Sequence, residues 1–270
     1  MKPYMQPSET DKEILKDKTL DYRVLNLAVN TFNENNTAYW HKSIGGYHAA
    51  KLRRYQEMIE EHIQGEMSGV FSKLSEAGGD MNKVDSNASP VLNTRYFILP
   101  LQGGKTAPVF NPYAYGNAWF VDNVEYVDNA NEEIEALHNI NPLHNAVVDR
   151  RFEAQVKNVQ APDSLDYIVL KEYQPNDLKY EVSSKNGGVV VFSEIYYPGW
   201  ISTIDGEEVE HGRADYILRA MNVPAGKHVI EFKFDPKSLH VTETIAYIAL
   251  ALLALCAIVV IVIESRKRKS

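Results

Sequence analysis

The sequence predicts an α+β multidomain protein, in which a small layered α/β domain precedes an antiparallel β-sandwich and one C-terminal transmembrane helix. Three observations predict this class. Strand and helix signals alternate over residues 21–150, short strand signals recur without helices over residues 151–240, and residues 245–263 form an uninterrupted apolar block. Residues 1–20 are polar and aperiodic, so we expect a connector there, with at most a short helix.

The predicted α/β domain begins with a strand at residues 22–27. A helix is expected from Tyr47 to about Ile63, where apolar residues recur every three or four positions. Residues 64–90 are rich in glycine and small polar side chains, and we expect a mobile excursion there. A short helix near Ile134 and three further strands complete the domain; the strands are expected at residues 95–99, 118–127 and 146–148.

The predicted β-sandwich is built from seven strand-like runs between residues 152 and 234. Turn residues separate these runs, as at Asn186-Gly187-Gly188 and Asp205-Gly206. In residues 229–234 apolar and charged side chains alternate, which is typical of a sheet with one buried and one solvated face. Short strands at this spacing, with no helix between them, favour an antiparallel sandwich.

Residues 244–263 are predicted to form a transmembrane helix. The 19 residues 245–263 contain no charge, glycine or proline, and as a helix they are about 28 Å long, close to the roughly 30 Å of a hydrocarbon core. A buried core helix is the alternative, but one rarely runs so long without a polar residue. The basic tail, residues 264–270, follows directly, and positive charge marks the cytoplasmic side. We therefore expect a cytoplasmic tail and extracytoplasmic soluble domains.

The first 20 residues hold no apolar core of a signal peptide, although this orientation requires export. We therefore expect the chain to be the C-terminal piece of a longer protein, with upstream transmembrane helices as its missing partners. A cytosolic domain with a C-terminal tail anchor is the alternative. That arrangement would require the basic tail to cross the membrane.

The composition disfavours several classes of function. Of the 28 basic and 36 acidic residues, four basic and one acidic residue lie in residues 264–270, so residues 1–263 carry a formal charge of −11. Such a domain repels a phosphate backbone, and we expect no nucleic-acid partner. The single cysteine, Cys256, lies in the predicted membrane helix, so the soluble part has no thiol ligand or nucleophile. No phosphate-loop, dinucleotide or zinc motif occurs, and we predict no cofactor, no metal site and no identifiable catalytic residue.

Residues 35–54 form the densest polar and aromatic stretch and are the candidate ligand-binding segment. Its glycines precede the predicted helix, so free backbone N–H groups of the first turn could receive an anion. Its aromatic rings could stack on a sugar, and the sandwich offers a further indole. The alternative is that the glycines only permit a turn and the rings only pack. The candidate binding residues are Tyr39, Trp40, His41, Lys42, Gly45, Gly46, Tyr47, His48, Lys51 and Trp200.

Several runs resemble the C-terminal portion of YfhO-type bacterial membrane proteins. They are residues 39–55 (YWHKSIGGYHAAKLRRY), 93–97 (NTRYF), 116–121 (GNAWFV), 192–200 (FSEIYYPGW) and 223–228 (VPAGKH), in this order. The resemblance implies a multi-span protein of the bacterial inner membrane, related to the GT-C glycosyltransferases, which transfer sugars from polyprenyl-phosphate carriers outside the cytoplasm. In those enzymes the catalytic acid lies in an early loop that this chain lacks, so no catalytic residue is carried over.

The resulting expectation is the extracytoplasmic C-terminal part of a glycosyltransferase-like membrane protein. This part would position an acceptor glycan or polymer, with membrane lipid, a lipid-linked sugar and a surface glycan as partners. Whether the full-length protein is an enzyme stays open. The alternative is a non-enzymatic, membrane-anchored module that binds a glycan or a protein.

Overall fold

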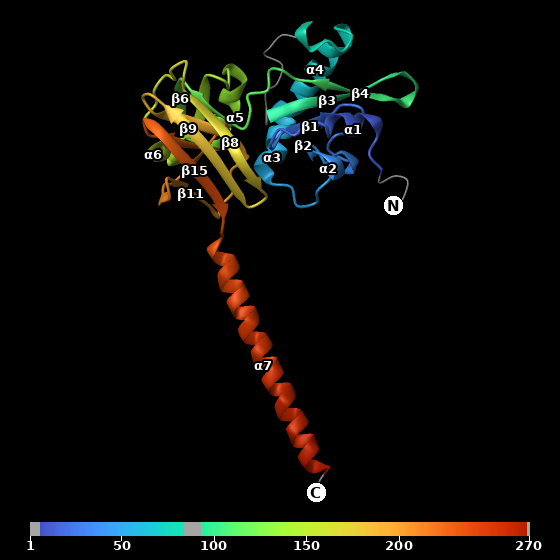
Figure 1. The fold of residues 1–270 in the computed structure, drawn as a ribbon, viewed down its shortest axis with the longest axis vertical. Helices are drawn as coiled ribbons and strands as arrows, with labels where there is room; N and C mark the ends of the chain where they lie inside the picture. Colours follow the sequence, from blue (N-terminus) through green and yellow to red (C-terminus); the bar gives the residue numbers. More distant parts are fainter. Residues whose placement is uncertain (1–5, 84–92, 269–270) are drawn as a thin grey trace.

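The computed structural model describes residues 6–83 and 93–268 of the 270-residue chain. In this part the elements form an α/β unit, a two-sheet β-sandwich and a long helix that leaves the sandwich at one end (Figure 1). The predicted fold class is confirmed: helices and strands are mixed, antiparallel sheets form a β-rich region, and a long apolar helix ends the chain.

A mixed four-stranded sheet organises the α/β unit. In spatial order its strands are β2 (Lys42–Ser43), β1 (Arg23–Asn26), β3 (Thr94–Pro100) and β4 (Thr106–Phe110). β1 is parallel to both of its neighbours, whereas β4 returns antiparallel to β3. The inner strands β1 and β3 are covered on both faces, and their apolar side chains alternate between the two sides.

One face of this sheet is covered by α1 (Glu9–Ile14), whose Ile14 packs on Val24. α1 begins at Ser8, which forms a capping box with Asp11 and satisfies free N–H groups of the first turn. The expected connector, residues 1–20, therefore contains a helix that belongs to the layered unit.

The other face is covered by one continuous helical segment, made of α3 (Arg53–Met58), the π-helical turn η2 (Ile59–Ile63) and α4 (Gln64–Glu76). Val70 and Leu74 of α4 are fully buried in the core that Phe97 of β3 also joins. Burial of this apolar stripe extends the helix beyond Ile63.

The structure corrects the predicted extent of this helix. It begins at Arg53 rather than Tyr47, and it runs on through part of residues 64–90, where a mobile excursion was expected. Gly65 and Gly69 made that stretch look irregular, yet they face open space on the helix surface. Within the expected excursion, residues 84–92 lie outside the described residues.

The sandwich consists of two antiparallel sheets with an aromatic core between them. One sheet has the order β13-β14-β10-β5 and the other the order β12-β11-β15-β9-β8. Across the core, Phe192 contacts Tyr180 and Phe232 edge to face, with ring centroids 5.1 and 4.8 Å apart. The strands are β5 (Ala118–Val121), β8 (Tyr167–Gln174), β9 (Asp177–Ser184), β10 (Gly188–Ile195), β11 (Trp200–Ile204), β12 (Glu207–Glu208), β13 (Gly212–Ala214), β14 (Leu218–Val223) and β15 (Gly226–Phe234).

β5 differs from expectation, because it pairs with β10 of the sandwich rather than with the α/β unit. The expected strand 118–127 is thereby split, and β6 (Asn123–Val127) instead lies parallel to β7 (Asn145–Asp149), beside α5 (Ala130–Ala136). The expected boundary at residue 150 thus does not coincide with the division between sheets. The remaining short helices are α2 (Asn36–Trp40), η3 (Met81–Lys83), η5 (Gln102–Gly104), η6 (Leu137–Asn139), η7 (Arg150–Phe152) and α6 (Glu153–Val156).

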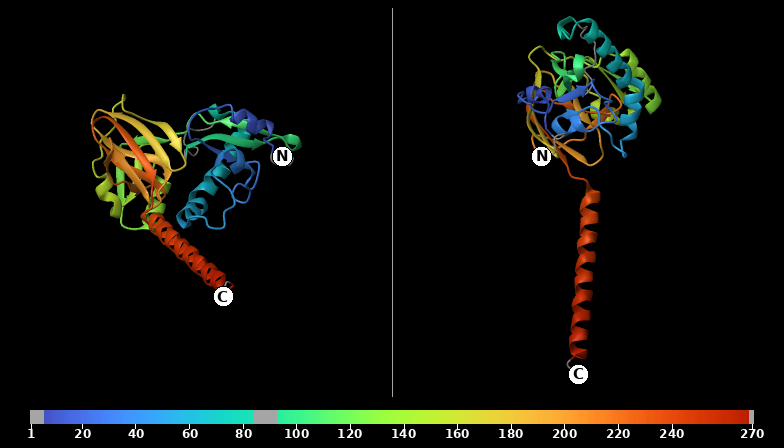
Figure 2. Two further views of the ribbon diagram at one scale, coloured as in Figure 1. Left: turned by 60° about the horizontal axis from the view of Figure 1, so that its bottom comes forward. Right: turned by 90° about the vertical axis from the view of Figure 1, so that its right-hand side faces the viewer.

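The C-terminal helix α7 (Lys237–Lys267) is the one helix of the described chain that is long and apolar enough to cross a membrane. It extends past both ends of the predicted span 244–263 and has no buried residue (Figure 2). Its start is fixed to the sandwich, since Asp235 N donates to Gly199 O at 2.9 Å and Pro236 packs on Gly199.

Substitution of Gly45 tests how closely the loop before α3 approaches Thr31. A Cβ at residue 45 would lie 1.9 Å from Thr31 O, so Gly45→Ala should destabilise the fold by at least about 2 kcal/mol. Gly69→Ala, a matched change at a helical position with open space, should instead stabilise by roughly 0.5–1 kcal/mol. Urea unfolding of the detergent-solubilised chain measures both, and equal effects would contradict the close approach.

Candidate functional site

Half of the predicted binding residues converge on one open hollow of about 380 Å³. Its predicted members are Gly45, Gly46, Tyr47, His48 and Lys51, and its wall is completed by Phe32, Asn35, Ala38, Ile44, Ala50, Leu52 and Tyr55. The hollow thus combines aromatic rings with amide, imidazole and ammonium groups. Its volume falls in the range of small-ligand pockets.

The loop around the hollow is held by its own backbone. Gly46 N donates to Thr31 O at 2.7 Å, and Tyr47 N donates to Asn35 Oδ1 at 2.9 Å. Lys51 Nζ lies 5.4 Å from the ring centre of Phe32, in cation–π range. The Tyr47 ring is 61% exposed, so its face is free to stack on a ligand.

The expected anion cradle is not formed, because the helix begins only at Arg53. The N–H groups of Gly46 and Tyr47 are used within the loop, and that of Ala50 is bound by His48 Nδ1 at 3.1 Å. The free N–H groups of a helix start therefore do not face the glycines.

His41 and Lys42 point away from the hollow. His41 is buried, with Nε2 2.9 Å from Asp11 Oδ1. The Lys42 ammonium pairs with Asp21 and lies 3.0 Å from the ring centre of Tyr173. Lys42 thus contacts the sandwich strand β8 rather than a ligand site.

The remaining predicted residues lie elsewhere. Tyr39 and Trp40 form an edge-to-face pair on α2, with ring centroids 4.9 Å apart. Trp200 packs between the guanidinium of Arg219, 3.9 Å from its ring centre, and Phe234, 5.5 Å away. Trp200 therefore packs within the sandwich and lies apart from the segment 35–54.

The loop that lines the hollow lies at the end of the molecule from which α7 leaves. In Figure 1 the light-blue segment between α2 and α3 lies on the side from which α7 leaves, whereas α4 lies on the opposite side. The right-hand view of Figure 2 shows the same arrangement.

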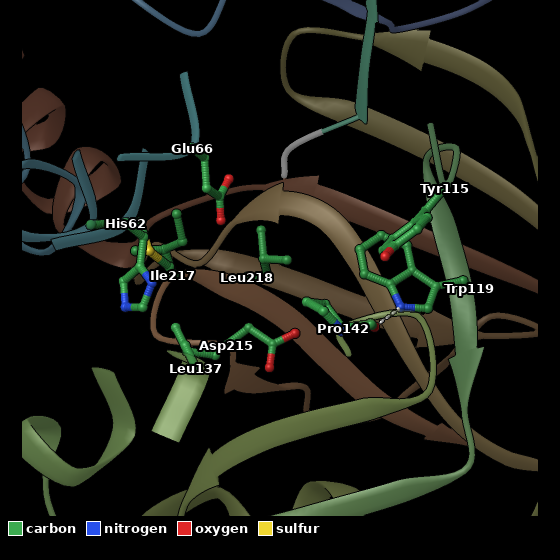
Figure 3. Close-up of a pocket in the computed structure, with 10 residues that line it drawn as sticks. His62, Glu66, Tyr115, Trp119, Leu137, Pro142, Asp215, Ile217 and Leu218 are labelled. Carbon is green, nitrogen blue, oxygen red and sulfur yellow. Dashed lines mark hydrogen bonds between the residues drawn. The ribbon is translucent and has the colours of Figure 1, made fainter. Parts of the chain in front are cut away.

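A second site was not predicted from the sequence. It is a pocket of about 60 Å³ between the helical segment and the inner sandwich sheet (Figure 3). Of its lining residues, Asp215, His62 and Trp119 are buried, whereas Glu66 and Tyr115 are half-exposed. The other lining residues are Met58, Leu137, Pro142, Ile217 and Leu218.

The backbone that presents Asp215 is strained. Asp215 and Tyr216 have φ angles of 47° and 69°, a region that costs a residue other than glycine on the order of 1–3 kcal/mol. Contacts from several elements hold them there. Asp215 N donates to Val147 O at 2.8 Å, Tyr216 N donates to Glu133 Oε1 at 3.2 Å, and the Tyr216 hydroxyl donates to Glu57 at 2.5 Å.

The Asp215 carboxyl group is only half satisfied. Oδ1 accepts from Val147 N at 2.8 Å, but buried Oδ2 has no hydrogen-bond partner among the described residues. In Figure 3 the carboxyl lies among the side chains that line the pocket. Burial raises the pKa of Asp215 to about 7, and the nearby charge of Glu133 adds to the rise.

The other polar groups of the pocket are held rigidly. Trp119 Nε1 donates to Pro142 O at 2.8 Å, and the Tyr115 and Trp119 rings pack edge to face with their centroids 5.3 Å apart. Burial, together with the charge of Glu66, raises the pKa of Tyr115 to about 12. His62 Nε2 lies 2.9 Å from Ile134 O, and burial lowers the pKa of His62, so this imidazole is neutral.

Comparison with known proteins gives no family assignment: no family model, no curated protein and no solved structure matches the chain. The resemblance to YfhO-type proteins stays a prediction. Function must therefore be argued from the sites themselves.

Asp215→Asn tests the buried carboxyl group. Since the folded pKa is raised, its contribution to stability is fully present below about pH 4, the unfolded pKa, and is lost as the pH rises through 7. The asparagine carries no such proton and keeps the acceptor for Val147. The free energy of unfolding of the variant, relative to that of the parent, should therefore rise between pH 4 and pH 8 by up to about 4 kcal/mol.

Urea unfolding at both pH values measures this difference. Asp177→Asn, at an exposed aspartate at the start of β9, is the matched control. A constant difference between Asp215→Asn and the parent across the range would contradict the raised pKa.

Proposed function

We propose that the chain is the extracytoplasmic C-terminal part of a glycosyltransferase-like membrane protein and positions a glycan acceptor next to the bilayer. The observation that carries this proposal is the place of the aromatic hollow, on the end of the molecule from which α7 leaves. Sugars carried on polyprenyl phosphate are held at the membrane surface, so an acceptor must be held at the same height. The exposed Tyr47 ring offers a stacking face for a sugar, and Lys51 and His48 offer donors to its hydroxyl groups.

The hollow supports binding rather than chemistry. None of its lining residues carries a carboxylate, whereas glycosyl transfer and hydrolysis use carboxyl groups as acid, base or nucleophile. A reacting centre would therefore be built from other segments, such as the upstream membrane helices that we propose as partners. α7 supports this arrangement, because its apolar side chains make no contact with the soluble part and need lipid or neighbouring helices.

The same feature favours a second candidate function, a non-enzymatic membrane-anchored module that binds a glycan. In that case the hollow would act alone. Transfer of sugar from a polyprenyl-phosphate donor by the full-length protein, measured with and without residues 21–240, separates the two. Loss of transfer without these residues favours acceptor positioning, and intact transfer contradicts it.

Tyr47→Ala tests the hollow as a glycan site. Loss of the stacking ring should weaken binding of envelope oligosaccharides to the immobilised chain by about tenfold, equal to about 1.4 kcal/mol. Phe71→Ala is the control, because Phe71 is also an exposed aromatic residue but lies on α4, at the opposite end of the α/β unit. Equal binding by Tyr47→Ala and the parent would contradict a sugar site in this hollow.

The proposed orientation can be tested by cysteine labelling. In a Cys256→Ala background, a cysteine at exposed Leu165 should react with a membrane-impermeant maleimide in intact cells. A cysteine at Arg266 should react only after permeabilisation, because we place the basic tail in the cytoplasm. The reverse pattern would indicate a tail anchor with a cytosolic domain.

A further inference from the structure

The buried pocket of Figure 3 has the chemistry of a cation site. We propose that it binds an alkylammonium group, with Asp215 as the counter-ion and Trp119 as the aromatic wall. This site is separate from the aromatic hollow, and the proposal does not depend on the acceptor-positioning function.

The first argument is the missing partner of Asp215. Asp215 is buried, with only 5% of its surface exposed. Its Oδ2 has no hydrogen-bond partner among the described residues. Two arginines, Arg54 and Arg213, pair with Glu133 at 3.2 and 2.9 Å rather than with Asp215. A buried carboxylate without a cation is costly, so the pocket itself is the place where a cation can satisfy it.

The second argument is the shape and lining of the pocket. A volume of about 60 Å³ holds several water-sized groups and suits the end of a small amine. Its wall is mostly apolar, and Trp119, the best aromatic partner for a cation, is fixed by its hydrogen bond to Pro142. Glu66, a half-exposed lining residue, adds a second acidic group to the pocket.

A metal ion fits this pocket less well than an ammonium group. Among residues 6–83 and 93–268 there is no group of three or more His, Cys, Asp or Glu residues placed to hold one. An ammonium group needs fewer charged ligands than a metal ion, since it also gains from aromatic faces.

The backbone supports a built site rather than a packing defect. Two adjacent residues, Asp215 and Tyr216, are held in the left-handed region by contacts from three other segments. His62, on the opposite wall, lies in a π-helical turn, which is frequent at functional sites. Both irregular segments face the same pocket.

The test is calorimetric titration of the whole chain in nanodiscs at pH 7.5 with ethanolamine. We expect one saturable site in the parent and at least tenfold weaker binding in Asp215→Asn, which keeps the hydrogen bond to Val147. Ethylene glycol, the neutral analogue, should not bind. Asp177→Asn should bind as the parent does.

A second probe, glucosamine, distinguishes the source of the amine. Tighter binding of glucosamine than of ethanolamine would assign the site to an amino sugar, and the reverse order to a small amine or headgroup. Two outcomes would overturn the proposal: no binding of either amine by the parent, or equal binding by the parent and Asp215→Asn.

Discussion

Burial of one sheet on both of its faces is the constraint on which the soluble part depends. In β10, Val190 and Phe192 face the aromatic core of the sandwich, while Val189 and Val191 belong to the core shared with the α/β unit. A strand buried on both faces cannot shift its register by one residue without exchanging the two sets of side chains. The inner sheet therefore fixes the sandwich and the α/β unit relative to each other.

This shared sheet also explains where the polar groups lie. Several buried polar groups lie where segments from both units meet. Near the end of β10, Arg23 Nη1 of β1 donates to Ser193 O at 2.8 Å. Asp215, in the connection between β13 and β14, lines the pocket beside the helical segment.

The sequence made the sandwich strands predictable because their turns are local. Gly187 and Gly206 adopt positive φ angles, 73° and 87°, and mark turns that need no remote partner. The pairing of β5 with β10 was not predictable, since its strands lie some 70 residues apart and its signal is only a short apolar run. The continuation of the helix into α4 was hidden by Gly65 and Gly69, although Val70 and Leu74 had the right spacing.

The candidate sites show the same difference between local features, which were predictable, and contacts with distant segments, which were not. Tyr47, His48 and Lys51 lie in one loop, and their proximity followed from the sequence, but the direction of His41 and Lys42 depended on Asp11, Asp21 and β8. Asp215 was missed because its environment comes from Val147, Glu133 and the helical segment, all distant in the chain. The one available signal was an acidic residue in the short run of residues 214–218, whose other members are apolar or aromatic.

The contacts of Asp235 and Pro236 with Gly199 join α7 directly to the base of the sandwich. The eight residues 237–244 continue the helix by about 12 Å above the apolar segment, while the headgroup layer on one side measures roughly 5–8 Å. In the proposed membrane arrangement, the base of the sandwich lies just clear of the headgroups. Any rotation or tilt of α7 within a bundle of helices would turn the whole soluble part with it.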